Sequence, residues 1–219
     1  MSTAKNPRKN SARLMLIGGT LIAALAGGYF ASLGGHQERV QQTSAAGEAG
    51  KYQYAVGRPG IGQDAPLFVR PSTDGTSFNL GAFQGKTVLL YFQEGVGCQP
   101  CWDQLKDIEK NWGQFQAAGV DTLVSITGDP LGTLTRKVKL EGLKTPLLSD
   151  AGLTVSRMYT TNEYGMMGNG YNGHSFILVG PDGKVRWRAD YGGAPQYNMY
   201  IPVPNLLADM KRDLGALEP

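Results

Sequence analysis

After residue 86, two patterns of hydrophobic residues take turns along the chain, one typical of buried strands and one typical of helices. The run TVLLYF at 87–92 lies between polar and glycine residues, as is typical of a strand buried on both faces. Residues 100–118 instead repeat apolar side chains at helical spacing and end before Gly119. The two patterns predict a buried strand that leads through a short loop into an amphipathic helix.

The same alternation continues toward the C-terminus. Pro181, Asp182 and Gly183 give a turn signal between two apolar runs, which predicts a β-hairpin. We predict further strands over 120–126, 145–149, 176–179 and 185–189, and further helices over 131–143, 153–159 and 206–214. This order predicts an α/β fold with a central mixed sheet flanked by helices.

A 22-residue segment without charge occupies residues 14–35, and the 13 residues before it contain four basic and no acidic side chains. About 20 apolar residues span a bilayer, and basic flanks stay in the cytoplasm. We therefore predict a basic cytoplasmic tail at 1–13 and a transmembrane signal-anchor at 14–35. The protein would be a single-pass protein of the cell membrane with its catalytic domain on the extracytoplasmic side. The alternatives are a cleaved signal peptide, with small residues at 24 and 26, and a buried core helix.

The net charge of +3 changes its meaning once it is divided along the chain. The tail accounts for +4, so the remaining residues, with 17 basic and 18 acidic side chains, carry −1. A nucleic-acid partner needs clustered basic residues in the folded part, so none is expected. The polar segment 36–57 lacks apolar periodicity and predicts a flexible stalk, which leaves 58–219 as one folded domain.

The two cysteines, Cys98 and Cys101, lie between the buried strand and the predicted helix. Free backbone amides and the positive end of the helix dipole stabilise a thiolate at Cys98 and so lower its pKa. Cys101 follows on the same helix face, close enough for a disulfide, and Pro100 suits the first helical turn. Such a pair predicts thiol–disulfide exchange, in which Cys98 attacks and Cys101 releases the product.

Two other interpretations of this motif have less support. A zinc site would need further ligands, but the chain contains only two cysteines and two histidines, one of them in the predicted stalk. A purely structural disulfide would close a very short loop and add little stability. We expect no cofactor and no bound metal.

An ordered series of motifs resembles the redoxin branch of the thioredoxin superfamily. That branch contains the AhpC/TSA peroxiredoxins and the membrane-anchored TlpA/ResA-type thiol-disulfide oxidoreductases. The resemblance covers about residues 60–190 and rests on GQDAPLF at 62–68, DG at 74–75, FQGK at 83–86, the strand at 88–92, CQPC at 98–101, DAG at 150–152 and FILVGPDGKV at 176–185. It implies a thioredoxin-like fold with the active cysteines at a strand-to-helix junction.

The chain departs from both branches of the family. Thioredoxin-like reductases carry tryptophan directly before the first cysteine, where this chain has Gly97, and a cis-proline three residues before the later strand's phenylalanine, where it has Gly173. Peroxiredoxins carry a proline and a hydroxyl residue seven and three positions before the catalytic cysteine, where this chain has Tyr91 and Gly95. The peroxide-orienting group is thus missing, whereas both reacting sulfurs are present.

Several neighbours of the motif are candidate supporting residues. Glu94 and Asp103 are acids that could carry protons to and from Cys101. The alternative is that Glu94 is a solvated acid of the loop and that Asp103 is a charge near the helix start that complements the helix dipole. Trp102 is expected to pack on the sulfurs or to form a substrate platform. His174 is either a structural histidine or, with the two cysteines, a soft copper(I) site similar to that of SCO-type proteins.

We therefore predict a membrane-anchored thiol:disulfide oxidoreductase that acts on protein thiols and disulfides. The resemblance implies that a membrane thiol transporter of the DsbD/CcdA type reduces it again. The alternatives are a peroxiredoxin-type thiol peroxidase of the AhpC/TSA family and an SCO-like copper-handling protein.

Overall fold

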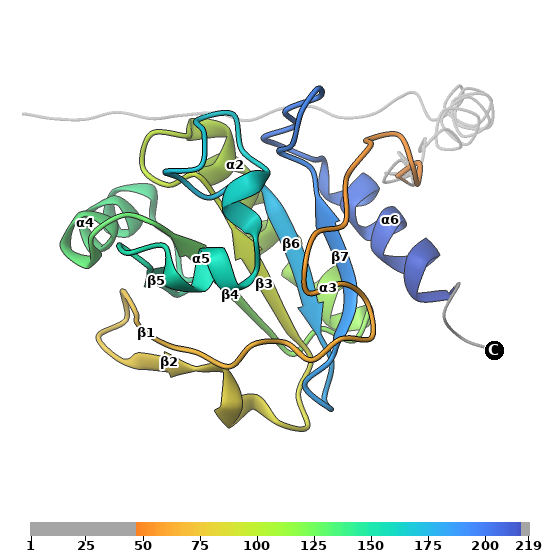
Figure 1. The fold of residues 1–219 in the computed structure, drawn as a ribbon, viewed down its shortest axis with the longest axis horizontal. Helices are drawn as coiled ribbons and strands as arrows, with labels where there is room; N and C mark the ends of the chain where they lie inside the picture. The colour runs from red at the N-terminus through yellow and green to blue at the C-terminus, as the bar shows by residue number, and fades with distance from the viewer. Residues whose placement is uncertain (1–46, 216–219) are drawn as a thin grey trace, which may run out of the picture. The chain divides into compact units, whose positions relative to one another are not determined.

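The computed structural model describes residues 47–215, which fold around a five-stranded mixed sheet with strand order β5-β4-β3-β6-β7 (Figure 1). The sheet strands are β3 (Val88–Phe92), β4 (Thr122–Thr127), β5 (Leu147–Ser149), β6 (Ser175–Val179) and β7 (Val185–Asp190). The helices are α2 (Gln99–Lys110), α3 (Trp112–Ala117), α4 (Leu131–Glu141), α5 (Thr154–Met158) and α6 (Val203–Gly215), with 3-10 turns at Leu80–Phe83 and Thr161–Glu163. A small antiparallel pair, β1 (Val69–Pro71) and β2 (Ser77–Asn79), precedes them.

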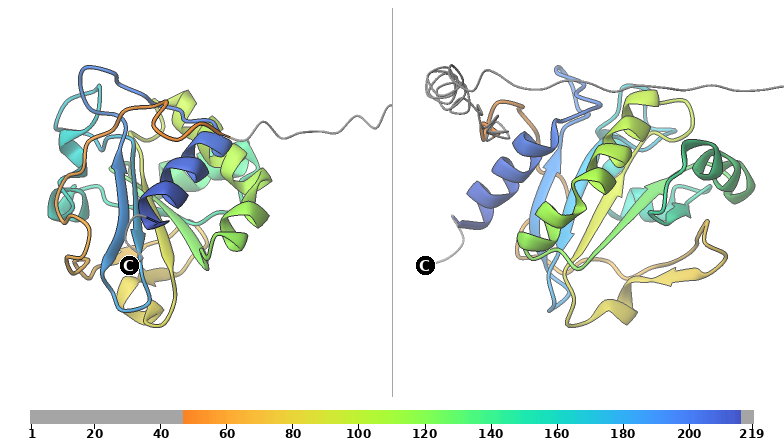
Figure 2. Two further views of the ribbon diagram at one scale, coloured as in Figure 1. Left: turned by 90° about the vertical axis from the view of Figure 1, so that its right-hand side faces the viewer. Right: turned by 180° about the vertical axis from the view of Figure 1, so that it is seen from behind.

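The central strand β3 is buried along its whole length, as its continuous apolar run predicts. It pairs in parallel with β4 and antiparallel with β6. Leu89 and Tyr91 contribute to the core beneath α2, α3 and α6, whereas Val88, Leu90 and Phe92 contribute to the core beneath α5 and the β1–β2 pair (Figure 2). The predicted thioredoxin-like α/β architecture and the β6–β7 hairpin are therefore confirmed.

The predicted helix over 100–118 is two helices rather than one. α2 ends at Lys110 and α3 begins at Trp112, with Asn111 between them in a non-helical conformation at φ −105° and ψ 15°. The Asn111 side-chain amide donates to the carbonyl of Asp107 at 2.8 Å, so it competes with the helical backbone as asparagine commonly does. The break lets α3 turn Phe115 into the core.

The predicted stalk is not free of the domain over the residues that the structure describes. Ala55 forms an antiparallel bridge with Asp190, and Tyr54 packs its ring on Tyr191 at a centroid distance of 4.9 Å. The Gly57 amide donates to the buried carboxylate of Asp190 at 2.7 Å. The folded domain therefore begins before residue 58.

The predicted membrane segment and tail lie outside the described residues, as does 36–46 of the stalk. Between residues 47 and 215, none of the helices combines the length and the apolar character that a membrane crossing requires.

A buried ion pair joins the early segment to the sheet. Arg188 is fully buried and donates to both carboxylate oxygens of Asp190, at 2.8 and 3.0 Å, as well as to the carbonyls of Pro59 and Tyr159. All of these acceptors come from segments distant from α2. The pair therefore helps to fix the domain around residues 57–59.

We expect Arg188→Met to destabilise the protein by about 3–5 kcal/mol, because it leaves the buried Asp190 carboxylate without its partner. Urea unfolding measures the change. Arg186→Met on the same strand is the control, since its pair with Asp182 is exposed and its loss should change the stability little. Equal effects of the two variants would contradict the assigned role of the buried pair.

Candidate active site

The two cysteines lie at the junction between the loop after β3 and the start of α2. Cys98 directly precedes the helix, and Pro100 and Cys101 are its second and third residues. A disulfide joins Cys98 to Cys101, with their Cα atoms 5.4 Å apart. The strand-to-helix position and the pairing of the two cysteines agree with the prediction.

The helix-start position predicts an exposed Cys98 nucleophile and a buried Cys101 resolving thiol, and only the burial of Cys101 is found. Cys101 is completely buried, whereas Cys98 retains 6% of its accessible surface. Cys98 is therefore the more accessible of the two, but it is not the exposed residue that a loop position implies. Met199, from the segment before α6, packs with the two cysteines and provides this cover.

Tyr91 connects the central strand to the second cysteine. Its hydroxyl donates to the carbonyl of Cys101 at 3.2 Å and lies 3.1 Å from Nδ1 of His174. A hydroxyl has one proton and a carbonyl only accepts, so the imidazole Nδ1 must carry a proton and donate to Tyr91. Nε2 of His174 is then the bare acceptor nitrogen, and among the described residues it has no hydrogen-bond partner.

The surroundings keep His174 uncharged. The side chain is fully buried, and burial lowers the pKa of its imidazole from 6.5 to about 3. Its ring packs edge-on against Tyr91 and Phe176. His174 therefore acts as a neutral structural group beside Cys101.

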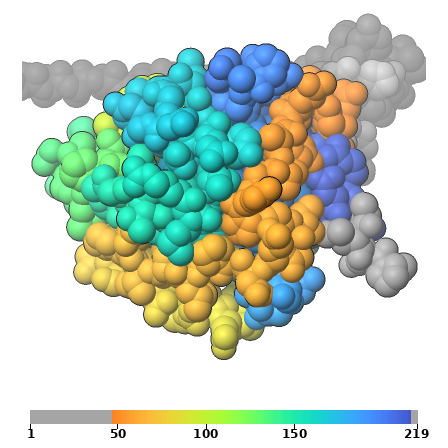
Figure 3. Space-filling view, viewed as in Figure 1, coloured from red at the N-terminus to blue at the C-terminus, as the bar shows by residue number. Residues whose placement is uncertain are grey.

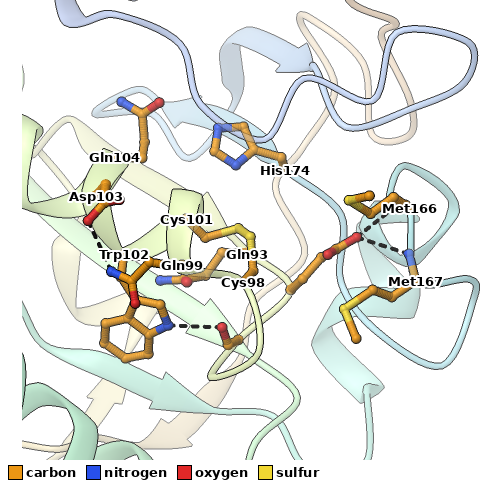
Figure 4. Close-up of a disulfide and its surroundings, with 12 residues drawn as sticks. Gln93, Cys98, Gln99, Cys101, Trp102, Asp103, Gln104, Met166, Met167 and His174 are labelled. Atoms are coloured by element: carbon orange, nitrogen blue, oxygen red, sulfur yellow. Dashed lines mark hydrogen bonds between the residues drawn. A yellow bond between two sulfur atoms is a disulfide. The ribbon is translucent and has the colours of Figure 1, made fainter.

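Glu94 is buried and faces away from solvent, which excludes the interpretation as a solvated loop acid. Its Oε1 accepts from the backbone amides of Met166 and Met167 at 2.6 and 3.1 Å. Burial raises the pKa of this carboxyl, and the two amide hydrogen bonds partly oppose the rise. Figure 4 shows Met166 and Met167 on the opposite side of the disulfide from Gln104 and Asp103.

Trp102 and Asp103 do not face the sulfurs. The indole of Trp102 is buried and donates to the Gly95 carbonyl at 2.9 Å, so it braces the loop before Cys98 instead of forming a substrate platform. Asp103 is on the exposed face of α2, where it accepts from Gln99 and pairs with Lys106 (Figure 4). A proton-carrying role for Asp103 is therefore not supported.

The glycines at the site serve different purposes. Gly97 is exposed, and a Cβ there would only touch the end of Met167 at 3.9 Å. At Gly173 a Cβ would lie 1.7 Å from the Tyr164 carbonyl oxygen. The position that holds a proline in thioredoxin-like reductases is therefore glycine here because another part of the chain lies directly on it.

The copper alternative needs Cys98, Cys101 and His174 in one cluster. In the part of the chain that the structure describes, no group of three or more histidine, cysteine, aspartate or glutamate residues is arranged to hold a metal ion. Nδ1 of His174 is moreover bound to Tyr91. The geometry does not support that alternative.

Sequence reasoning missed three residues at this site. Met199 covers the dithiol, and nothing in its local pattern indicates this. Gln104 is buried one helical turn after Cys101 and accepts from the Ile201 amide at 2.6 Å, so helical spacing from the motif would have found it. Asp129 accepts from the Val96 amide at 2.9 Å and holds the loop before Cys98 in place.

We expect Gly173→Ala to destabilise the protein by about 1–3 kcal/mol, since the added methyl group overlaps a backbone carbonyl. Urea unfolding tests this. Gly170→Ala is the matched control, because nothing lies within 4 Å of a Cβ at that position. A neutral Gly173→Ala would show that the segment around Tyr164 moves aside at little cost.

His174 makes stability depend on pH. Its pKa is lower in the folded chain than in the unfolded chain, so its contribution is complete above the unfolded pKa of 6.5 and falls as the pH drops toward 3. Between about pH 7.5 and about pH 5.5 the wild type should lose about 1.4 kcal/mol more than His174→Gln. Urea unfolding at both pH values measures this difference, and equal losses would show that the imidazole is charged in the folded state.

Comparison with known proteins finds relatives over most of the folded part of the chain. Residues 61–188 match the AhpC/TSA family. Peroxiredoxin Bcp from Escherichia coli strain K12 is 35% identical over 127 residues, which cover 57% of this chain and 81% of that protein. The thiol-disulfide oxidoreductase ResA from Halalkalibacterium halodurans is 34% identical over 98 residues, covering 45% of this chain and 55% of ResA.

Solved structures agree on the fold. Peroxidoxin BcpB from Mycobacterium tuberculosis superposes with a TM-score of 0.57 at 18% identity, covering 75% of this chain and all of that one. The reduced 2-Cys peroxiredoxin from Plasmodium vivax gives 0.58 at 23% identity, covering 69% and 80%. The chain therefore belongs to the AhpC/TSA family of the thioredoxin superfamily, and it is a thioredoxin-like redox enzyme.

Proposed function

We propose that the protein is a membrane-tethered, extracytoplasmic oxidoreductase that exchanges disulfides with partner proteins through Cys98 and Cys101. The observation that carries the proposal is the pairing of the two sulfurs across the first turn of α2, with Cys98 the more accessible. One redox couple of this geometry passes two electrons without a cofactor.

In the reductive direction, the two sulfurs have separate roles. The Cys98 thiolate, stabilised at the start of α2, attacks a substrate disulfide and releases one substrate thiolate, which takes a proton from solvent. The Cys101 thiol loses its proton and attacks the Cys98 sulfur of the mixed disulfide. The second substrate thiolate leaves and the Cys98–Cys101 disulfide forms, so the substrate is reduced as the dithiol is oxidised.

The predicted anchor at 14–35 supports the location, and the couple then needs an external source of electrons. A membrane dithiol donor of the DsbD/CcdA type would supply them by the reverse exchange, which restores the two thiols. The protein would thus act between this donor and its protein substrates.

A thiol peroxidase is the second candidate, supported by the similarity to Peroxiredoxin Bcp. Cys98 would be oxidised to a sulfenic acid by hydroperoxide and Cys101 would condense with it, which gives the observed disulfide and water. Gly95 and Tyr91 occupy the positions of the usual hydroxyl residue and proline, so this candidate lacks the customary peroxide-binding groups.

Replacing each cysteine separates the two candidates. We expect Cys98→Ser to reduce exchange with a protein disulfide, such as that of insulin, to the uncatalysed rate, and Cys101→Ser to stop after one turnover with the substrate still attached. Insulin reduction and mass spectrometry measure these outcomes. Wild-type consumption of hydroperoxide faster than its reduction of insulin would favour the peroxidase instead.

A further inference from the structure

Three segments around the dithiol contain no charged side chain. They are 95–102, 164–173 and 191–202, and they contain no aspartate, glutamate, lysine, arginine or histidine. Charged residues make up 18% of the whole chain, whereas the 30 residues of these three segments include none. We call these three segments the uncharged rim.

The segments of the uncharged rim are in contact with one another. Met199 packs on both cysteines. A Cβ added at Gly97 would lie 3.9 Å from the end of the Met167 side chain, and one added at Gly193 would lie 3.1 Å from the Tyr164 ring. Figures 1 and 3 show the 164–173 and 191–202 segments side by side at the end of the domain where α2 begins.

The uncharged rim also exposes large hydrophobic side chains. Met166 and Met167 are 60% and 43% exposed. Tyr171, Tyr197 and Tyr200 are exposed as well, so the uncharged rim holds five of the eleven exposed large hydrophobic residues of the described chain. Exposed apolar side chains on neighbouring segments are typical of an interaction surface.

The backbone beside the dithiol is already occupied by the chain itself. The Gly173 amide donates to the Thr161 carbonyl at 2.9 Å, and the His174 amide donates to the Tyr164 carbonyl at 3.1 Å. Neither of these two amides is therefore free to pair with a partner strand, which favours recognition by side chains. Glu94 holds the backbone of Met166 and Met167 through their amides, so the path of this segment is set before a partner arrives.

The chemistry of the uncharged rim specifies the partner. Tyrosine offers a large rigid contact area, glycine and asparagine adapt to the partner backbone, and methionine fits apolar side chains of varied shape. A charged partner residue placed on the 164–173 segment would lose water and find no opposite charge in that segment. An uncharged, largely apolar polypeptide segment meets neither cost.

We propose that the uncharged rim is the docking surface for a flexible polypeptide segment whose cysteine is flanked by uncharged, apolar residues. This rests on the proposed disulfide-exchange function and specifies its substrate class. The partner cysteine would lie over Cys98 while its neighbours contact Met166 and Met167.

The test compares two peptides, each with one cysteine joined to 2-thiopyridine by a disulfide. One has leucine, valine and alanine around the cysteine, and the other has aspartate and lysine. The Cys98 thiolate of the reduced full-length chain attacks the peptide sulfur, and thiopyridine leaves as its protonated thione. Cys101 then attacks Cys98 and frees the peptide thiol. Release of the thione is followed by absorbance.

We expect the apolar peptide to react about ten-fold faster than the charged one, and the double variant Met166→Gln, Met167→Gln to remove most of this preference. Each peptide rate is divided by the same protein's rate with 2,2′-dithiodipyridine, a small disulfide that needs no docking, so any effect on the reacting sulfur itself cancels. Met158→Gln is the matched control, since Met158 is a 40% exposed methionine on α5 outside the uncharged rim.

Equal wild-type rates with the two peptides would overturn the proposal, as would an unchanged preference in the double variant or an equal loss in Met158→Gln. Slow reaction of the wild type with 2,2′-dithiodipyridine itself would instead overturn the exchange function, and the docking proposal with it. The small disulfide thus distinguishes failure of the chemistry from failure of docking.

Discussion

The hydroxyl of Tyr91 joins the parts of the molecule on which the redox chemistry depends. It comes from the central strand, donates to the carbonyl of Cys101 on α2, and accepts from His174 at the start of β6. Its ring stacks on Phe176 at a centroid distance of 4.5 Å. Two adjacent strands and one helix thereby share a single buried polar contact, so the second sulfur has a fixed position relative to the sheet.

Most of the polar groups around the dithiol are neutral. His174 is uncharged, Trp102 and Tyr91 use their polar atoms on carbonyls, and Gln104 uses its side-chain oxygen on a backbone amide. The exception is the buried acid Glu94; burial and the charge of Glu94 together raise the pKa of Tyr91. The positive end of α2 acts in the opposite sense and favours a thiolate at Cys98, which suits exchange reactions in which one thiolate replaces another.

Local patterns in the sequence predict most of the fold. The strand at 87–92, the helix after Cys98 and the hairpin around Pro181–Gly183 each depend on neighbouring residues, so hydrophobic period and turn chemistry are enough to find them. Most ends differ by no more than two residues, as they do between β3 at Val88–Phe92 and its prediction, whereas α6 begins at Val203, three residues before its predicted start. The break at Asn111 is missed because the apolar spacing continues across it.

Features that depend on distant residues are not visible in the sequence. Residues 50–57 look like a stalk, yet their hydrogen bonds go to Asp190 and Asp209, which lie more than 130 positions later. Cys98 looks exposed because its cover, Met199, comes from a segment whose composition predicts no element. Asp103 and Trp102 are close to the motif in sequence, but the helix turns them away from the sulfurs.

The buried carboxylate of Glu94 has a mechanical consequence. Glu94 is four residues before Cys98 on the same loop, and it holds the backbone of Met166 and Met167 by two hydrogen bonds. A force applied to either methionine is therefore transmitted to the loop that carries the nucleophile. Any molecule that pulls this segment outward also changes the path of the chain into α2, so contact at the surface and the position of the reacting sulfur are mechanically coupled.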